Sequence, residues 1–410
     1  LPHSPNSSSP HSSLLNPRSP TTTNLQETMA PPQSTGPSAA EYLQDSRFEQ
    51  TFTLPPDNSY SEPFKVTYSD FGFRAYAGPE HDNVVLFCAP LLASRFLHIT
   101  KDKLAKKQKV RIINVDRPGF GGTTPVPAAE DRVMAWLRIV PALLEHLGIH
   151  HVAIVAQSAG TIYALNTLLY LPHLLHPTRP YAALCVPWMH PSHSEAALMS
   201  MVHKLPAAAI ATVDVLATFF NSTLQPVTGF SSGVFSALIG SLGMAKERSV
   251  VDGADADDAP FEDAVKPEIA AHAFRQGCSG MGQEAVMLLK RSGPADVWGS
   301  WLDIDSYVPL LSTQIKAGAT ADTISPAAQQ VSESRTLKVE VFYSEEDNMI
   351  GTKAGPEWFD NCWSAEHRAD AIEYSSVVVP DTAHDTILDL RFGIAEEILK
   401  TVKQRNSDEA

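Results

Sequence analysis

The chain has 410 residues, 43% of them hydrophobic, so it can bury a large core, and its formal net charge is −15. Nucleic acids and anionic membrane surfaces repel an acidic protein, which argues against both as partners. The four cysteines (Cys88, Cys185, Cys278 and Cys362) are widely spaced and match no zinc-binding pattern. We therefore expect reduced thiols in a cytoplasmic protein that needs no metal and no cofactor.

The first 40 residues are rich in Ser, Pro, Thr and Asn and show no apolar periodicity. Such a segment cannot bury enough apolar surface to offset its chain entropy, so we expect residues 1–40 to be disordered. The segment has no apolar run of signal-peptide length, and Arg18 is its only Lys or Arg residue. The folded part is predicted to start near residue 41.

From residue 41 onward, strand-like and helix-like segments alternate, which predicts an α/β protein with a mainly parallel central sheet flanked by helices. Gln50–Leu54 and Lys65–Ser69 are expected to be antiparallel edge strands. The strands of the parallel part are expected around Val84, Arg111, Val152, Ala182, Lys338 and Ser375. Among the helices, Glu130–Leu147 has one apolar face and a stop at Gly148, and Phe392–Val402 is expected to shield the last strand.

A tight turn with a central serine interrupts this alternation. The strand-like run His151–Val155 leads into Ala156-Gln157-Ser158-Ala159-Gly160, and a helix-like run from Thr161 to Tyr170 follows. A serine on such a strand-to-helix turn is displayed for attack, and small residues beside it let the turn pack closely against its strand and helix. The first position departs from G-x-S-x-G, and the motif alone is equally compatible with a structural turn. Ser158 is therefore a candidate nucleophile that needs partners elsewhere in the chain.

Two loops further along the chain supply these partners. A serine hydroxyl is a weak nucleophile, so it requires a histidine to take its proton and a carboxylate to orient that histidine. The β-rich run that ends at Tyr343 leads into a polar loop in which Asp347 is the predicted acid, with Glu345 and Glu346 as alternatives. The next β-rich run leads into a loop that contains His384, the predicted base. The order of serine, acid and histidine fits one known arrangement of such triads.

With these three residues in this order, the chain resembles proteins of the α/β-hydrolase fold. The segment Val110–Thr123, with its Asp-Arg-Pro-Gly-Phe-Gly turn, is similar to the strand and turn that these enzymes commonly place before the nucleophile. The resemblance extends from about Phe52 to Val402, apart from one long insertion. Ser344 stands where the family often has a glycine in its acid loop. The resemblance implies that the predicted serine, acid and histidine act as a catalytic triad.

The resemblance also implies an oxyanion hole made of two backbone N–H groups. The first belongs to the residue after the nucleophile, which is Ala159 here. The second comes from the loop after an early strand, here Cys88-Ala89-Pro90-Leu91-Leu92, where family members often carry His-Gly. Proline has no N–H to donate, so Leu91 is the predicted second donor. Without a second donor, acyl transfer would be slow.

A long insertion separates the strand-like run Ala182–Val186 from the acid-bearing strand, and we expect it to form a mostly helical cap. The predicted boundaries are residues 41–190 and 336–410 for the two parts of the core and 191–335 for the cap. The apolar stretches Leu205–Phe220 and Phe230–Met244 are too short to span a bilayer, so no stable membrane insertion is expected. Phe219 and Phe220 are candidates to line an apolar pocket over the nucleophile. The acidic tract 252–258 is expected to be a solvated loop.

These features together predict a cofactor-independent serine hydrolase of the carboxylesterase or lipase type. Its substrate would be an ester, a thioester or a related acyl compound of small to medium size, and apolar. A serine in place of an aspartate at the turn argues against epoxide hydrolysis and dehalogenation, which relatives with this fold perform with a carboxylate nucleophile. Acyl transfer or lyase chemistry with the same triad, and ligand binding without catalysis, remain alternatives. The sequence does not determine the oligomeric state.

Overall fold

The structure is a computed structural model that describes residues 38–78, 81–91, 94–212, 258–322 and 336–407. The described residues all belong to the unit Ser38–Ala410. Residues 1–37, the apolar stretch 230–244, the second half of the apolar stretch 205–220 with Phe219 and Phe220, and nearly all of the acidic tract lie outside the described residues. The predictions made for these segments stay predictions.

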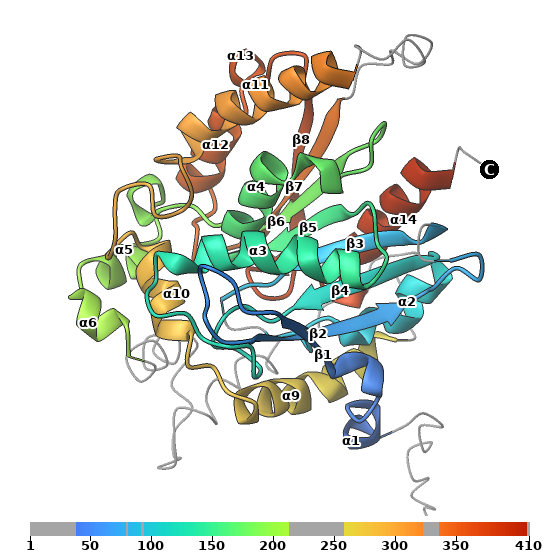
Figure 1. The fold of residues 1–410 in the computed structure, drawn as a ribbon. Helices are drawn as coiled ribbons and strands as arrows, with labels where there is room; N and C mark the ends of the chain where they lie inside the picture. Colours follow the sequence, from blue (N-terminus) through green and yellow to red (C-terminus); the bar gives the residue numbers. More distant parts are fainter. Residues whose placement is uncertain (1–37, 79–80, 92–93, 213–257, 323–335, 408–410) are drawn as a thin grey trace, which may run out of the picture. The chain divides into compact units, whose positions relative to one another are not determined.

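A single sheet of eight strands, in the order β1-β2-β4-β3-β5-β6-β7-β8, forms the centre of the described unit (Figure 1). The strands are β1 (Gln50–Leu54), β2 (Phe64–Gly72), β3 (Asn83–Cys88), β4 (Val110–Val115), β5 (Ala153–Gln157), β6 (Tyr181–Cys185), β7 (Leu337–Glu346) and β8 (Ile372–Ala383). Strand β2 runs antiparallel to both β1 and β4, and every other neighbouring pair is parallel. The predicted mainly parallel sheet is confirmed.

Strand β2 differs from its prediction as an edge strand. It lies between β1 and β4, and its residues from Val66 to Phe71 are all buried. Side chains that are buried on both faces of a strand belong to the interior of a sheet. The edges of the sheet are β1 and β8.

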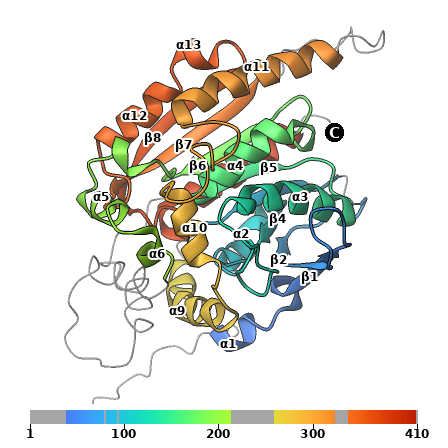
Figure 2. The same ribbon diagram turned by 60° about the vertical axis from the view of Figure 1, so that its left-hand side comes forward.

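A layer of helices that includes α4 flanks the sheet (Figures 1 and 2). In this layer α3 (Asp131–His146) contacts α4 (Gly160–Tyr170), α4 contacts α11 (Ile304–Asp322), and α11 contacts α12 (Ala354–Cys362). Helix α3 agrees closely with its predicted range, because its buried apolar residues repeat with helical spacing. A second group, α2 (Asp102–Lys107) and α14 (Ile394–Ser407), packs against β2, β3 and β4.

The remaining helices are short or belong to the long connection between β6 and β7. They are α1 (Ala39–Tyr42), α5 (Ala197–His203), α6 (Ala207–Ile210), α9 (Ala259–Arg275), α10 (Met281–Leu288) and α13 (Ala365–Arg368). Short 3₁₀ turns occur at Ser46–Phe48, Ile99–Lys101, Pro172–Leu174, Pro191–His193 and Leu390–Phe392. Among the helices of the described ranges, none combines the length and apolar character that crossing a membrane requires.

The connection between β6 and β7 reaches the core at separate places. Helix α11, which the predicted cap boundaries include, lies in the helix layer beside α4 and α12. Helix α9 instead contacts α1 and two of the 3₁₀ turns. Its buried Glu262 pairs with Lys101 and accepts hydrogen bonds from the Thr100 hydroxyl at 2.9 Å and the Leu390 N–H at 2.7 Å. The connection is therefore joined to the core by buried charge as well as by apolar packing.

Candidate active site

The turn after β5 holds Ser158 in an unusual backbone conformation. Its φ angle is +50°, a left-handed value that costs a residue with a side chain roughly 1–2 kcal/mol. Two hydrogen bonds fix the turn: the Ser158 N–H donates to the Cys185 carbonyl at 3.0 Å, and the Trp188 N–H donates to the Ser158 carbonyl at 3.2 Å. Only 5% of Ser158 is exposed. The strand-to-helix turn that the sequence predicted is therefore present and is tied to the end of β6.

The small residue at the start of α4 brings this turn against the end of β3. A Cβ atom at Gly160 would overlap the Cys88 carbonyl oxygen, so a larger side chain would push the helix away from the strand. Ala159 directly precedes α4, where backbone N–H groups lack partners within the helix and the helix dipole is positive. An anion beside Ser158 would thus meet a favourable electrostatic environment.

Three side chains from three different strand ends form a hydrogen-bonded series. The Nε2 atom of His384 lies 2.8 Å from the Oγ atom of Ser158, and its Nδ1 atom lies 2.8 Å and 3.0 Å from the two carboxylate oxygens of Asp347. The tautomer with hydrogen on Nδ1 satisfies both contacts, because Nδ1–H donates to Asp347 and Nε2 accepts from the serine hydroxyl. The structure thus brings together the three residues that the sequence singled out.

The carboxylate of Asp347 is buried and receives further hydrogen bonds. The N–H groups of Met349 and Ile350 each donate to Oδ1 at 2.9 Å, and the Ser344 hydroxyl donates to Oδ2 at 3.0 Å. Burial alone would raise the pKa of Asp347, but His384 and the two backbone N–H groups outweigh it, so the pKa lies below its usual value. In the sequence, Ser344 stands out only as a departure from the family's glycine, and no motif predicts its contact with the acid.

The two alternative acids lie elsewhere. Glu345 accepts a hydrogen bond from the Asp381 N–H at 2.8 Å, and Glu346 lies at the end of β7, where it pairs with β8. Asp347 is the carboxylate that contacts His384. Burial tends to lower the pKa of His384, but the neighbouring Asp347 carboxylate raises it above the usual value. His384 is therefore a stronger base than an isolated histidine.

A second histidine, His98, contacts the residue before Ser158, and the sequence did not predict this contact. The Nε2 atom of His98 lies 3.3 Å from the Oε1 atom of Gln157, whose amide nitrogen donates to the His384 carbonyl at 3.4 Å. Burial lowers the pKa of His98 well below its usual value, so the ring is neutral and donates from Nε2. Gln157 thus connects His98 with the backbone of His384. No sequence pattern signals a contact of this kind between distant loops.

The loop after β3 faces Arg117 through its carbonyl groups. The two terminal nitrogens of Arg117 donate to the carbonyl oxygens of Ala89 and Pro90, the latter at 2.7 Å, and the Leu91 carbonyl lies 3.5 Å away. Arg117 is buried, and Leu91, the predicted second oxyanion donor, is partly buried. Leu92 lies outside the described residues. The Asp-Arg-Pro-Gly turn therefore supports the loop directly.

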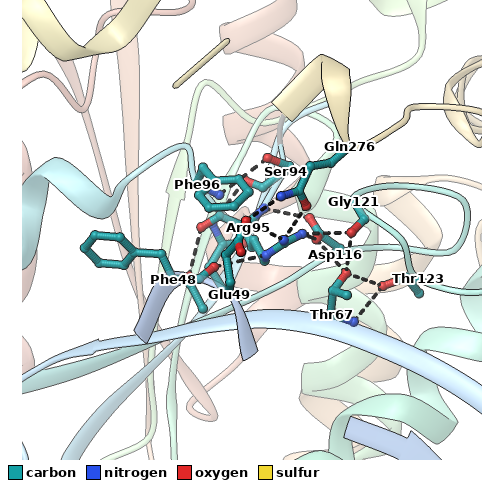
Figure 3. A network of polar contacts seen from close by, with 12 residues as sticks. Phe48, Glu49, Thr67, Ser94, Arg95, Phe96, Asp116, Gly121, Thr123 and Gln276 are labelled. Carbon is teal, nitrogen blue, oxygen red and sulfur yellow. Dashed lines mark hydrogen bonds and ion pairs between the residues drawn. The ribbon is translucent and has the colours of Figure 1, made fainter. Parts of the chain in front are cut away.

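Asp116, the neighbour of Arg117 in that turn, has a separate contact network (Figure 3). Its carboxylate accepts hydrogen bonds from the backbone N–H and the Nη1 of Arg95, both at 2.6 Å, and from the Thr67 hydroxyl at 2.8 Å. Figure 3 shows the Arg95 guanidinium between Asp116 and Gln276, to which it also donates. These contacts hold the chain that follows the loop after β3, so Asp116 has a structural role.

Other candidate sites receive less support. Among the residues that the structure describes, no three His, Cys, Asp or Glu side chains gather in a way that would hold a metal ion. All four cysteines are free, and burial raises the pKa of the Cys88 thiol to about 12, which makes it a poor nucleophile. An apolar depression is lined by Ser94, Phe120, Ala273, Phe274, Gly277, Cys278 and Met281. None of the hydrogen-bonded series lines it.

No family model matches the chain, and no curated protein matches its sequence. Solved structures do match it. An esterase from Thermogutta terrifontis with bound malate has a TM-score of 0.50 and 14% sequence identity, and the match covers 87% of this chain and 100% of that one. A structure from a study of carboxylesterases of Nitrososphaera gargenis has a TM-score of 0.51 and 13% identity, with the same coverage. A putative aryl esterase from Burkholderia cenocepacia has a TM-score of 0.50 and 13% identity, again over 87% and 100%. The chain has the α/β-hydrolase fold.

Proposed function

We propose that the protein is a serine hydrolase that cleaves an ester, thioester or related acyl bond without a cofactor. The observation that carries this proposal is the hydrogen-bonded series from Ser158 through His384 to Asp347. In the first step, Oγ of Ser158 attacks the substrate carbonyl carbon while Nε2 of His384 takes the hydroxyl proton. His384 then gives this proton to the leaving group, which departs and leaves an acyl-serine. Water that His384 deprotonates hydrolyses the acyl-serine and restores the enzyme.

Asp347 assists by holding the histidine in the required tautomer and by stabilising the imidazolium that forms in each step. The carboxylate stays ionised at neutral pH, because its pKa lies below the usual value. The tetrahedral oxyanion would be held by the N–H groups of Ala159 and Leu91. The position of Ala159 at the start of α4 supports its part in this role.

The class of substrate is part of the same proposal. The three solved structures with the same fold are described as esterases, a carboxylesterase among them, which favours a carboxylic ester as the bond that is cleaved. We propose an acyl compound of small to medium size and apolar character, in a soluble cytoplasmic setting. A series of p-nitrophenyl esters with graded acyl chains, assayed on the full chain, would measure the preferred size.

A fluorophosphonate probe tests the reaction type, because it reacts with a serine only when a base and an oxyanion hole activate it. We expect the folded full chain to be labelled at Ser158, as located by mass spectrometry of the peptides. Ser158→Ala and heat-unfolded protein are the controls, and neither should be labelled. An absence of labelling in the folded protein contradicts the proposal.

Two further measurements, product analysis with added alcohol and ligand binding, test the alternatives to hydrolysis. If added alcohol changes the product from the free acid to a new ester, the triad serves acyl transfer rather than hydrolysis. If no ester turns over and a small ligand binds Ser158→Ala as tightly as the unmodified chain, the site is a binding site without catalysis.

A further inference from the structure

The loop after β3 lies between two functionally different residues. The strand order β4-β3-β5 places β3 in the middle, with Arg117 just after the end of β4 and Ser158 just after the end of β5. The carbonyl groups of Ala89 and Pro90 are directed to Arg117. Arg117 therefore holds both carbonyl oxygens, and the Ala89 oxygen also lies near the start of α4, where a Cβ atom at Gly160 would come within 3.0 Å of it.

The geometry of the peptide group determines what the opposite side of the loop presents. No cis peptide bond occurs in the described ranges, so the carbonyl of Pro90 and the N–H of Leu91 belong to one planar trans unit and point in opposite directions. Because Arg117 Nη2 holds the Pro90 oxygen at 2.7 Å, the Leu91 N–H points away from Arg117. A reversed peptide would present a carbonyl oxygen there, which would repel an oxyanion.

A carboxylate from the connection between β6 and β7 holds Arg117 in place. Glu284 of α10 lies with Oε1 at 3.2 Å from Arg117 Nε, an ion pair whose alignment falls short of a hydrogen bond. Its other oxygen accepts hydrogen bonds from Arg132 Nε at 2.5 Å and from the Tyr163 hydroxyl at 2.8 Å. Arg117, Glu284, Arg132 and Tyr163 are at most 2% exposed. This buried cluster joins the loop after β3 to α3, α4 and α10.

The charges in this cluster explain why the loop carbonyls face it. Two guanidinium groups surround one carboxylate, so Glu284 alone does not balance the positive charge. The Arg117 guanidinium also lies 5.4 Å from the ring centre of Phe120 and 5.2 Å from that of Tyr163. A buried cation needs acceptors for its remaining N–H groups, and the carbonyl oxygens of the loop provide them.

We propose that Arg117 is a positioning residue that orients the Leu91 N–H as the second oxyanion donor, and that Glu284 fixes Arg117 for this task. Through Glu284, the inserted connection would then control the oxyanion hole. The kinetic consequences of this inference rest on the proposed hydrolase function, whereas the orientation of the Pro90–Leu91 peptide does not depend on it.

Arg117→Lys tests the inference, because one ammonium group cannot make all the contacts that the Arg117 guanidinium makes with two carbonyl oxygens and a carboxylate. Arg132→Lys is the matched control: Arg132 is equally buried and pairs with the same carboxylate, but its hydrogen bonds go to Glu284 and Gln283 rather than to the loop. For Arg117→Lys we expect kcat on a p-nitrophenyl ester to fall ~10²-fold with KM nearly unchanged. The affinity for a trifluoromethyl ketone, which forms the oxyanion, should fall by a similar factor. Arg132→Lys should lower the unfolding temperature without this kinetic signature.

Glu284→Gln provides the second variant if Arg117→Lys does not fold, since it keeps the volume of the side chain and removes its charge. Crystal structures of the full chain and of Glu284→Gln report the orientation of the Pro90–Leu91 peptide directly. A peptide that reorients or becomes heterogeneous in Glu284→Gln supports the inference. An unchanged peptide, or full kcat and ketone affinity in a folded Arg117→Lys, overturns it. If the unmodified chain neither cleaves esters nor reacts with the probe, the proposed function fails, and the crystal structures still decide the orientation.

Discussion

The Nε2 atom of His384 lies 2.8 Å from the Oγ atom of Ser158, although 226 positions separate the two residues in the chain. Ser158 follows β5 and His384 follows β8, and Asp347 follows β7, which lies between β6 and β8 in the sheet. The carboxyl ends of parallel strands meet at one edge of a sheet, so the sheet itself places these three loops together. The predictions below use this arrangement.

Two substitutions of Ser158 distinguish the loss of its hydroxyl from the strain of its backbone. Ser158→Ala is expected to lower kcat on an ester by roughly 10⁴-fold or more. Ser158→Gly loses the same hydroxyl, but glycine adopts the φ angle of +50° without cost. We therefore expect the glycine variant to be about 1 kcal/mol more stable than the alanine variant. Urea unfolding of both variants measures the difference, and equal stabilities would show that the turn is unstrained.

The pH dependence of hydrolysis should report the pairing of His384 with Asp347. The base is active only when neutral, so kcat/KM should rise with pH through the pKa of His384. The Asp347 carboxylate raises this pKa, so the midpoint should lie above the usual histidine value of about 6.5. Asp347→Asn should shift the midpoint to lower pH and reduce kcat by about 10⁴-fold. A midpoint that stays in place in Asp347→Asn is inconsistent with the pairing.

The Ser344 hydroxyl should contribute to stability and to rate through Asp347. Ser376 is a matched control, because each hydroxyl donates to an aspartate carboxylate at 3.0 Å, but Ser344 is only 3% exposed and Ser376 is exposed. Ser344→Ala is expected to cost about 1.5–3 kcal/mol of unfolding free energy and to lower kcat. Ser376→Ala should change stability by less than about 0.5 kcal/mol and leave kcat unchanged. Equal effects in the two variants would show that Ser344 contributes no more to stability and rate than an exposed hydroxyl.

A methyl group at Gly160 should separate α4 from the end of β3. Gly160→Ala is expected to lose about 1–3 kcal/mol of unfolding free energy, because the new Cβ overlaps the Cys88 carbonyl. The shift also moves Ala159 relative to the loop after β3, so kcat should fall as well. Gly277→Ala provides the control, since its φ of +103° is strained for alanine but no atom lies within 4 Å of the added Cβ. It should lose stability while kcat is retained.

The sequence predicted the features that depend on local pattern and chain order. Strand-like runs that end in Ser158, Asp347 and His384 were visible in the sequence, and the structure brings the three side chains together. Their catalytic roles stay predictions. The pairing position of β2 could not be predicted, because an alternating pattern gives no information on which strands lie beside it.

Contacts between distant side chains were beyond the reach of the sequence. Gln157 carries no signal for its hydrogen bond to the His384 carbonyl, 227 positions away, since this bond arises only after the sheet has formed. The Ser344 hydrogen bond to Asp347 spans only three positions, but no motif marks it. Glu284 lies in a segment without a recognisable motif, so nothing in the sequence marked it as the partner of Arg117.

Two glutamates of the connection between β6 and β7 limit how this connection can be exchanged in protein engineering. Glu284 and Glu262 both come from this connection, and both end beside buried cations of the core: Arg117 and Arg132 in one case, Lys101 in the other. A buried cation that loses its partner costs about 3–5 kcal/mol. The connection is therefore not an exchangeable module. A chimera that carries the corresponding segment of another protein with this fold must either supply carboxylates at both places or replace the core cations at the same time.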